Sequence, residues 1–324
     1  MILRLAHVVI AVDDLAAARS FYVELLGFLE HRRESDALYL RAAEEFDGWS
    51  LGVVQRTTPG LLHSAFRVSD PGDLDALEDL HQRLGAPTRR VPSGVEPGQG
   101  VALRVLTPDG HAVEFVHDLE EIEPYDTDGR LRLPMRISNT ARGVPPARLD
   151  HVSLRVASVP QSLRYWADEL AFSPSELWLN DRDEPHIAWV RRTTTTHDVA
   201  LGTNAEPAFH HVAYAVSDPH ALLRTADLLG DARIPQQLEW GPGRHGATNA
   251  FAMYLRDPAG NRLELFNGDY VRDLDRPPLS WRTADYALQG HSWWGDGPPP
   301  SFAETRALHQ ADWLAEPVGV PDAG

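Results

Sequence analysis

The chain repeats itself, and this repeat constrains the fold more than any other feature of the sequence. Residues 4–28, RLAHVVIAVDDLAAARSFYVELLGF, align without a gap with residues 148–172, RLDHVSLRVASVPQSLRYWADELAF. Two shorter pairs follow in the same order, 63–71 with 211–219 and 106–115 with 256–265. The two halves are therefore one duplicated unit with small insertions, and a repeat of this size decides the architecture.

Each half divides again into two similar units. In the second half, the strand-like run DHVSLRV is followed by the helical run SLRYWADELAF and then by the strand-like runs HIAWVRR and DVALGT. After HHVAYAV the order recurs, with helical HALLRTADLLGD and a closing hairpin, AFAMYLR and RLELF. We predict four β-α-β-β-β modules, two per domain, in an α+β fold whose sheets curl around a cavity with the helices outside.

The predicted domain boundaries follow from the repeat. An N-terminal domain spans 1–118 and a C-terminal domain spans 148–267, and the Pro-, Gly- and charge-rich passage 119–147 links them. Residues 268–324 have no clear period but are rich in Trp and Pro. We expect them to form an extension or lid over the cavity of the C-terminal domain, or a subunit contact, rather than a disordered tail.

Composition excludes several classes of function. The formal net charge of −17 argues against nucleic acid or an anionic membrane as a partner. The chain has no Cys, which excludes disulfides and thiolate sites, and all 30 basic residues are Arg, which excludes Schiff-base and P-loop chemistry. Neither a signal peptide nor a transmembrane run is recognisable, so we expect a cytoplasmic protein.

Two histidines and a glutamate stand at equivalent places in the modules of the second half. His151, His211 and Glu264 each lie on a predicted strand, and alternation places Ser153 and Arg155 on the cavity face beside His151. Two His and one carboxylate from three strands can cap one face of an octahedral ion and leave three positions open. Because the set lacks thiolate, we predict Fe(II) or Mn(II) in preference to zinc.

The last hairpin adds further polar residues to the same face. Its turn, DPAGN, has strong turn chemistry, and a five-residue loop there pairs Arg256 with Arg262. Tyr254 then falls directly opposite Glu264. A phenol beside an acid on an otherwise apolar hairpin indicates a functional site.

These residues carry a family resemblance. The paired modules with the His/His/Glu set resemble the vicinal oxygen chelate superfamily. The last hairpin is similar to the signature of its type I extradiol ring-cleaving dioxygenases, matched in order and spacing by His245, Met253–Tyr254, Asp257–Pro258, Gly260 and Glu264. Within that family the similarity to the homoprotocatechuate (3,4-dihydroxyphenylacetate) 2,3-dioxygenases extends along nearly the whole chain.

The resemblance implies an oxygenase that inserts both atoms of O2 in extradiol (meta) cleavage of a 3,4-dihydroxyphenylacetate-like or other 4-substituted catechol. His151, His211 and Glu264 would hold one non-haem Fe(II) or Mn(II), with the catechol and O2 at its open positions. The resemblance further implies that His197 is the acid/base, that His245 and Tyr254 hydrogen-bond the catecholate oxygens, and that Trp189 lines the pocket. It also implies a homotetramer.

The pocket for the catechol's substituent departs from the family. Arginines that hold the substrate carboxylate in similar enzymes correspond here to Trp240 and His291. An indole supplies no bidentate guanidinium, so we expect a wall suited to an alkyl, aryl or halogen substituent or to a cationic amine. Arg244 and Arg155 could still reach an anion by another route. The substrate-binding residues predicted from this comparison are Ser153, Trp189, Trp240, Arg244, Asn249 and His291.

The first half carries an equivalent triad, His7, His63 and Glu114. However, Arg104 and Val95 stand at the positions of Tyr254 and His245, and nothing there matches His197. We therefore predict a vestigial, non-catalytic site in the N-terminal domain.

Two alternatives stay open. The same scaffold hosts other metalloenzymes, namely glyoxalases, epimerases and resistance transferases, and fold alone does not settle function. The chain could also be a non-enzymatic protein that binds an aromatic ligand, although such a protein needs no metal triad.

Overall fold

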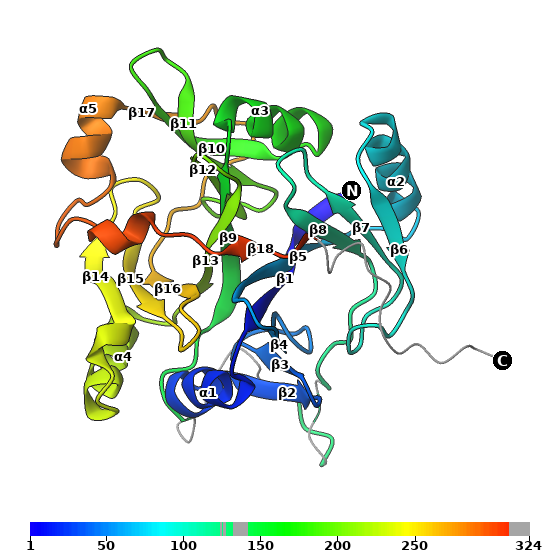
Figure 1. Ribbon diagram of the computed structural model, residues 1–324, viewed down its shortest axis with the longest axis vertical. Helices are drawn as coiled ribbons and strands as arrows, with labels where there is room; N and C mark the ends of the chain where they lie inside the picture. Colours follow the sequence, from blue (N-terminus) through cyan, green and yellow to red (C-terminus); the bar gives the residue numbers. More distant parts are fainter. Residues whose placement is uncertain (124, 126–127, 132–141, 311–324) are drawn as a thin grey trace.

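The computed structural model describes residues 1–123, 125, 128–131 and 142–310 (Figure 1). Parts of the expected linker (124, 126–127 and 132–141) and the end of the expected extension (311–324) lie outside the described residues. Two mixed sheets, one from each half of the chain, form the molecule, and short helices lie outside them.

The first half forms a sheet in the order β2-β3-β4-β1-β5-β8-β7-β6. Its first module is β1 (Ile2–Val12), α1 (Leu15–Arg19) with the π-helical continuation η1 (Ser20–Leu26), β2 (Leu29–Arg33), β3 (Ala37–Arg41) and β4 (Leu51–Gln55). Its second module is β5 (Gly60–Val68), α2 (Asp73–Arg83), β6 (Thr88–Val91), β7 (Ala102–Leu106) and β8 (Ala112–Val116).

The second half forms a sheet in the equivalent order, β14-β15-β16-β13-β9-β12-β11-β10-β17. One module is β9 (Arg148–Val156), α3 (Val159–Arg164) with η2 (Tyr165–Glu169), β10 (Ser173–Leu179), β11 (Pro185–Arg191) and β12 (Val199–Thr203). The other is β13 (Ala208–Ala215), α4 (Pro219–Asp231), η3 (Pro235–Gln237), β14 (Leu238–Arg244), β15 (Phe251–Arg256) and β16 (Arg262–Asn267). The predicted α+β fold of four β-α-β-β-β modules is confirmed.

Strand register places the predicted residues side by side. In each half the first strands of the two modules pair antiparallel at the middle of the sheet, β1 with β5 and β9 with β13. Ala213 on β13 pairs with His151 on one side and with Glu264 on the other, and Tyr254 pairs with Glu264 as the hairpin predicts. Because directly opposed residues share a face, a row of functional side chains crosses the sheet.

Local sequence explains where the longest helix begins and how it packs. The Asp218 side chain accepts a hydrogen bond from the Ala221 backbone N–H, and Pro219 supplies a fixed φ in the first turn. The buried face of α4 carries apolar residues at helical spacing, Leu222 and Leu229 among them, which join the common core.

The two halves share one apolar core and are joined by buried hydrogen bonds. The Tyr22 hydroxyl donates to Asp257 Oδ2 at 2.9 Å, and Asn261 Nδ2 donates to the carbonyl of Ala11 at 2.9 Å. Asp257 and Asn261 bound the turn of the last hairpin, so this turn ties the second half to the first.

The C-terminal extension crosses both halves. Its strand β17 (Leu279–Arg282) lengthens the second sheet by pairing with β10, and α5 (Thr283–Asp285) continues into η4 (Tyr286–Gly290). After η5 (Pro300–Ala303), the short strand β18 (Ala307–Leu308) pairs with β5 of the first half (Figure 1). The extension therefore covers the second half and fastens it to the first.

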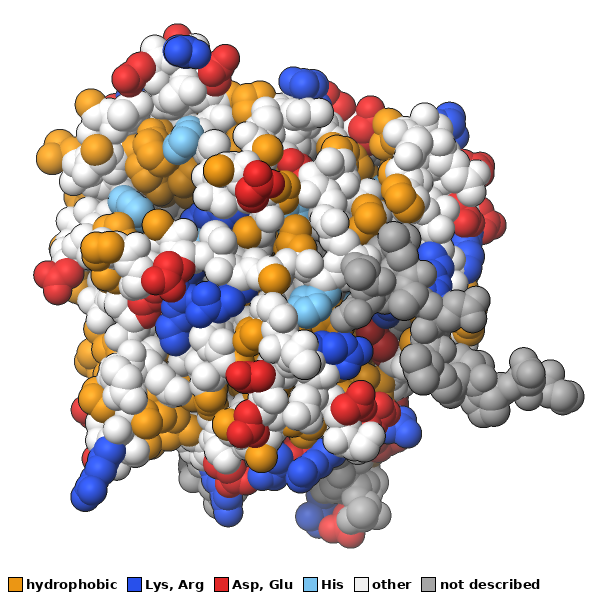
Figure 2. Space-filling model, viewed as in Figure 1, with side chains coloured by type: hydrophobic (Ala, Val, Ile, Leu, Met, Phe, Trp, Pro, Cys, Tyr) orange, Lys and Arg blue, Asp and Glu red, His pale blue; other side chains and the backbone are white. Residues whose placement is uncertain are grey.

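Within the described part of the chain, none of the helices is long and apolar enough to cross a bilayer. On the face shown in Figure 2, Arg side chains are interspersed with Asp and Glu side chains.

Candidate metal centre and substrate cavity

The predicted triad converges on one point inside the second half. His151 Nε2 lies 3.2 Å from His211 Nε2 and 3.3 Å from Glu264 Oε2, and His211 Nε2 lies 3.1 Å from the same oxygen. All three side chains are buried. Adjacent ligands of an octahedral ion with bonds of about 2.1 Å are about 3 Å apart, so the donor atoms have the spacing of ligands of one ion.

Neighbouring groups turn both imidazoles toward this point. His151 Nδ1 donates to Asp150 Oδ2 at 2.9 Å, which leaves Nε2 to face the centre. His210 Nε2 donates to the carbonyl of Phe302 at 2.9 Å, so its Nδ1 can accept the Nδ1–H of His211 at 2.7 Å. Hydrogen bonds of this kind fix the tautomer and the ring orientation of metal-binding histidines.

Charge at the centre is concentrated on the glutamate. Burial alone would raise the pKa of Glu264, but its contacts with the His151 and His211 imidazoles hold its pKa well below the usual range. Burial lowers the pKa of His211 to about 4 and keeps that imidazole neutral. Burial also opposes protonation of His151, yet hydrogen bonds to Asp150 and Glu264 raise its pKa to about 9. The centre therefore attracts a positive charge, either a proton or a metal ion.

A cavity opens beside the triad and is lined by most of the predicted site residues. The six predicted residues on its wall, besides the triad, are Ser153, Trp189, His197, His245, Tyr254 and His291.

His197 lies directly against the triad. Its ring packs on that of His151 with centroids 3.8 Å apart, and its Nδ1 lies 2.9 Å from the Thr196 hydroxyl. Burial, reinforced by the neighbouring His151, holds the pKa of His197 well below its usual value. A neutral imidazole in this position can accept a proton from a group bound at the cavity.

His245 and Tyr254 form a hydrogen-bonded pair on another wall. His245 Nδ1 donates to the backbone carbonyl of His291 at 2.6 Å, so its Nε2 accepts the Tyr254 hydroxyl at 3.0 Å. Burial raises the pKa of Tyr254 well above its usual value, which keeps the phenol protonated. A ligand oxygen close to the triad could accept the Tyr254 proton by replacing this mutual hydrogen bond.

Comparison with known proteins agrees with this geometry. The model of the Glyoxalase/Bleomycin resistance protein/Dioxygenase superfamily matches residues 4–115 and again residues 148–265. The chain belongs to this superfamily. The two matches correspond to the two sheets, and the second contains the whole triad.

Similar members of the superfamily are extradiol dioxygenases. The chain is 29% identical to a manganese-dependent 2,3-dihydroxybiphenyl 1,2-dioxygenase of Geobacillus genomosp. 3, over 91% of this chain and 94% of the relative. It is 30% identical to a metapyrocatechase of Geobacillus stearothermophilus, over 92% of this chain and 91% of the relative. Among solved structures, the chain superposes on homoprotocatechuate 2,3-dioxygenase of Brevibacterium fuscum, in its anaerobic complex with 3,4-dihydroxyphenylacetate, with a TM-score of 0.88. The two are 35% identical, and the match covers 96% of this chain and 94% of the other.

Three residues predicted from the family comparison lie outside the cavity wall. Trp240 stacks behind Tyr254 with centroids 5.2 Å apart and rings 10° from parallel, and its Nε1 donates to the Asp296 carbonyl. Arg244 Nη1 donates to the Asn249 carbonyl at 2.8 Å. Trp240 therefore supports the His245–Tyr254 wall and does not line the cavity itself, and its role as a flat wall for the substrate stays a prediction. Arg244 and Asn249 bond to each other away from the cavity.

The cavity wall includes residues that sequence reasoning did not assign to the site. His210 is next to His211 in the sequence, and this adjacency was its only signal. Tyr286 and Phe302 come from the aperiodic extension and line the cavity opposite the strands. Arg155, noted only as a possible anion contact, lines the cavity from β9.

Arg155 extends across the second sheet over Gly202 of β12. A side chain at 202 would meet the end of the guanidinium, which would then have to move. Among the described residues, no carboxylate lies within ion-pair distance of Arg155. Burial and the nearby Arg262 lower the pKa of Arg155 to about 10, at which it still carries its charge at neutral pH.

Proposed function

We propose that this chain catalyses extradiol cleavage of a substituted catechol by O2, at a single Fe(II) or Mn(II) held by His151, His211 and Glu264. One observation carries the proposal. The triad, the His197 imidazole and the His245–Tyr254 pair share one cavity in the second half. Metal ligands alone suit many members of the superfamily, whereas metal ligands with this set of proton donors and acceptors suit a diol substrate.

The ion and the protein groups around it would have separate roles. When bound, a divalent ion at the triad would acidify the catechol hydroxyls and bring the diol and O2 into one coordination sphere. Tyr254 is a protonated donor that can stabilise charge on a diol oxygen, and His245, which contacts the Tyr254 hydroxyl at 3.0 Å, helps to orient the diol. The Tyr286 and Phe302 rings from the extension restrict the entry of water.

His197 moves protons. Its ring packs on His151, so its Nε2 can reach the region beside the triad, and its low pKa keeps it neutral and ready to accept a proton. A group that first takes and later returns a proton is what ring opening next to a diol requires.

We further propose that the catechol carries an anionic or strongly hydrogen-bond-accepting substituent. Arg155 lies four residues along β9 from His151 on the same face of the strand, which puts the guanidinium at the far end of the cavity. Arg155 is half-buried, and its guanidinium has no carboxylate partner among the described residues, so an anionic ligand in the cavity could pair with it. This inference differs from the apolar wall expected from Trp240, which does not line the cavity.

Activity is tested with metal-free protein reconstituted with Fe(II) or with Mn(II). Anaerobic addition of a catechol should produce a new absorption band, and O2 should then give the yellow ring-opened product. A band without product after O2 is admitted would indicate a protein that only binds aromatic ligands. If neither appears with any catechol, a different chemistry of the superfamily, such as that of a glyoxalase, an epimerase or a resistance transferase, would replace the proposal.

The substituent is tested by comparing kcat/KM for 3,4-dihydroxyphenylacetate, 4-methylcatechol and dopamine. We expect the acid to be preferred, and Arg155→Met to erase that preference through a loss of about ten- to a hundredfold on the acid alone. An equal loss of kcat/KM on all three substrates would mean that Arg155 supports the fold and does not bind the substituent. Arg244→Met is the matched control, since Arg244 lies outside the cavity wall.

We also propose the homotetramer that the family resemblance suggests and the cytoplasmic location expected from the sequence. Light scattering of the purified chain tests the first, and cell fractionation tests the second.

A further inference from the structure

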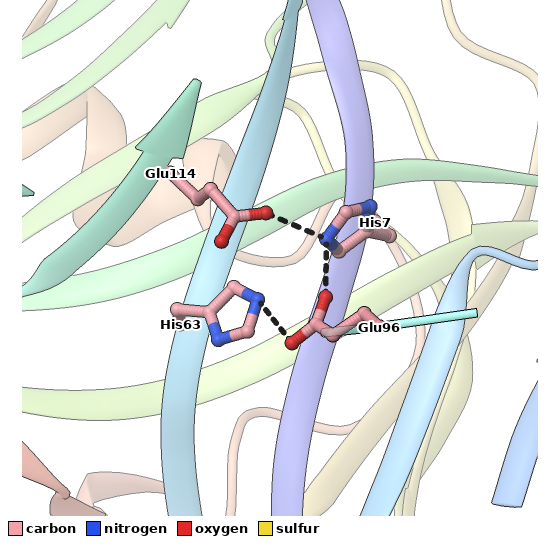
Figure 3. Close-up of side chains that lie close together, drawn as sticks. All are labelled: His7, His63, Glu96 and Glu114. Carbon is pink, nitrogen blue, oxygen red and sulfur yellow. Dashed lines mark ion pairs between the residues drawn. The ribbon is translucent and has the colours of Figure 1, made fainter. Parts of the chain in front are cut away.

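The first half holds a second buried cluster of potential metal ligands. His7 lies on β1, His63 on β5, Glu114 on β8, and Glu96 on the loop between β6 and β7 (Figure 3). Their donor atoms point toward one another and all lie within 4.8 Å of each other. Three residues of this cluster were recognised from the sequence, and the loop adds Glu96 as a fourth.

Three distances between potential ligand atoms are close to those in a four-coordinate site, and both oxygens of Glu96 contribute to them. His7 Nε2 lies 3.4 Å from Glu96 Oε2 and 3.6 Å from Glu114 Oε1, and His63 Nε2 lies 3.3 Å from Glu96 Oε1. A tetrahedral ion with bonds of about 2.1 Å holds its ligand atoms about 3.4 Å apart. The measured distances are close to this value and longer than ordinary hydrogen bonds.

The same atoms are buried and lack hydrogen-bond partners. His7 and Glu114 are 0% exposed, His63 is 3% exposed and Glu96 is 7% exposed. The cluster atoms without a hydrogen-bond partner are His7 Nδ1 and Nε2, His63 Nε2, Glu96 Oε2 and Glu114 Oε1. Apart from His7 Nδ1, these atoms meet one another only at ion-pair distances of 3.3–3.6 Å, and such a concentration of buried polar atoms at one point calls for an explanation. An ion at the centre would satisfy one donor atom of each residue.

Arg104 balances only part of the charge. Its Nε donates to Glu114 Oε2 at 2.5 Å and one Nη donates to Glu96 Oε1 at 2.9 Å. One guanidinium therefore contacts two buried carboxylates and leaves a net negative charge between them. The carboxylate oxygens that face His7 remain available to a cation.

Aromatic rings close the site to a substrate. The Trp49 ring packs on His7 with centroids 4.1 Å apart, and Tyr39 packs edge-on against Trp49. Trp49 Nε1 donates to the Pro97 carbonyl at 2.8 Å, which fastens the loop that carries Glu96. Four protein ligands without an open position are typical of structural metal sites, whereas catalytic sites keep a position for water or substrate.

We propose that His7, His63, Glu96 and Glu114 bind a second divalent ion, zinc by preference, that stabilises the first half and takes no part in turnover. Although this set also lacks thiolate, four protein ligands that leave no open position suit zinc, whereas the open three-ligand set of the second half suits Fe(II) or Mn(II). The inference goes beyond the proposed dioxygenase and does not depend on it, since the two clusters lie in different sheets.

Metal stoichiometry tests the proposal directly. The wild type and variants are loaded with zinc, freed of loose metal by gel filtration, and analysed by plasma mass spectrometry. We expect two ions per chain in the wild type, one in Glu264→Ala, one in Glu114→Gln, and none in the double variant. One ion in the wild type together with none in Glu264→Ala would overturn the proposal.

A second measurement guards against misfolding of the Glu114 variant. In the Glu264→Ala background, zinc should raise Tm, because an ion that binds only the folded state stabilises it by mass action. Glu96→Gln, a loop substitution of nearly equal size, should weaken zinc binding at least about tenfold and remove the rise in Tm. A rise that survives Glu96→Gln would place the ion elsewhere and refute the assignment.

Discussion

Two buried His/His/Glu clusters stand at equivalent places in the two halves, and they differ in what surrounds them. Beside Glu264, the hydrogen-bonded pair His245–Tyr254 faces a cavity. Beside Glu114, the charged pair Glu96–Arg104 and the Trp49 ring fill the corresponding region. One duplicated scaffold therefore carries an accessible centre and a closed one. The side chains next to the triad, more than the triad itself, separate a reaction site from a structural site.

The two clusters also differ in how their imidazoles are held. In the second half, Asp150 and His210 bond the outer nitrogens of His151 and His211. In the first half, His7 Nδ1 has no hydrogen-bond partner. An oriented imidazole binds metal more tightly, so the second cluster has the support that a catalytic ion requires.

The largest expected effect comes from removing one carboxylate from each cluster. Glu264→Ala should abolish turnover and metal binding in the second half, because two histidines alone do not hold an ion against water. Glu114→Ala, the matched change, should leave turnover close to wild type. Steady-state kinetics and metal analysis of both variants decide, and an inactive Glu114→Ala beside an active Glu264→Ala would reverse the roles of the two halves.

The next effect concerns His197, which has no counterpart in the first half. His197→Phe keeps an aromatic ring against His151 but removes the proton acceptor, so it should slow turnover by about a hundredfold to ten-thousandfold. Catechol binding, measured anaerobically by titration, should change little. Unchanged turnover with weaker catechol binding would make His197 a binding residue instead.

The contrast in imidazole support predicts a smaller effect. Asp150→Asn still accepts the His151 Nδ1–H but loses its charge, so metal affinity in the second half should fall about ten- to a hundredfold. The first-half cluster should keep its zinc, because Asp150 belongs to the other sheet. Competition with a chelator measures both sites in one experiment. Parallel loss at the two sites would point to a general loss of stability.

The features that sequence alone predicted are those fixed by period and by register. The repeat aligned His151 with His7, and strand alternation with a five-residue turn put Tyr254 opposite Glu264, as the pairing shows. Such arguments need only local geometry.

The features that sequence missed depend on irregular backbone. Trp240 pairs directly with Tyr254 between two register shifts of β14, and its ring stacks on the Tyr254 ring without lining the cavity. The extension contributes Tyr286 and Phe302 without any period to reveal them. Alignment of the two halves placed Val95 at the position of His245. In the structure, the next residue, Glu96, reaches the first-half cluster from the loop between β6 and β7.

The smallest expected effect tests what Arg104 does in the closed cluster. Arg104→Gln removes a positive charge that contacts both carboxylates, so repulsion of a bound cation falls and zinc affinity in the first half should rise, by at most about tenfold. Turnover should not change. Calorimetric zinc titration in the Glu264→Ala background isolates this site. A fall in zinc affinity would instead mean that Arg104 serves mainly to hold Glu96 and Glu114 in place. Arg104, the counterpart of Tyr254, would then orient the ligands and would not compete with the ion.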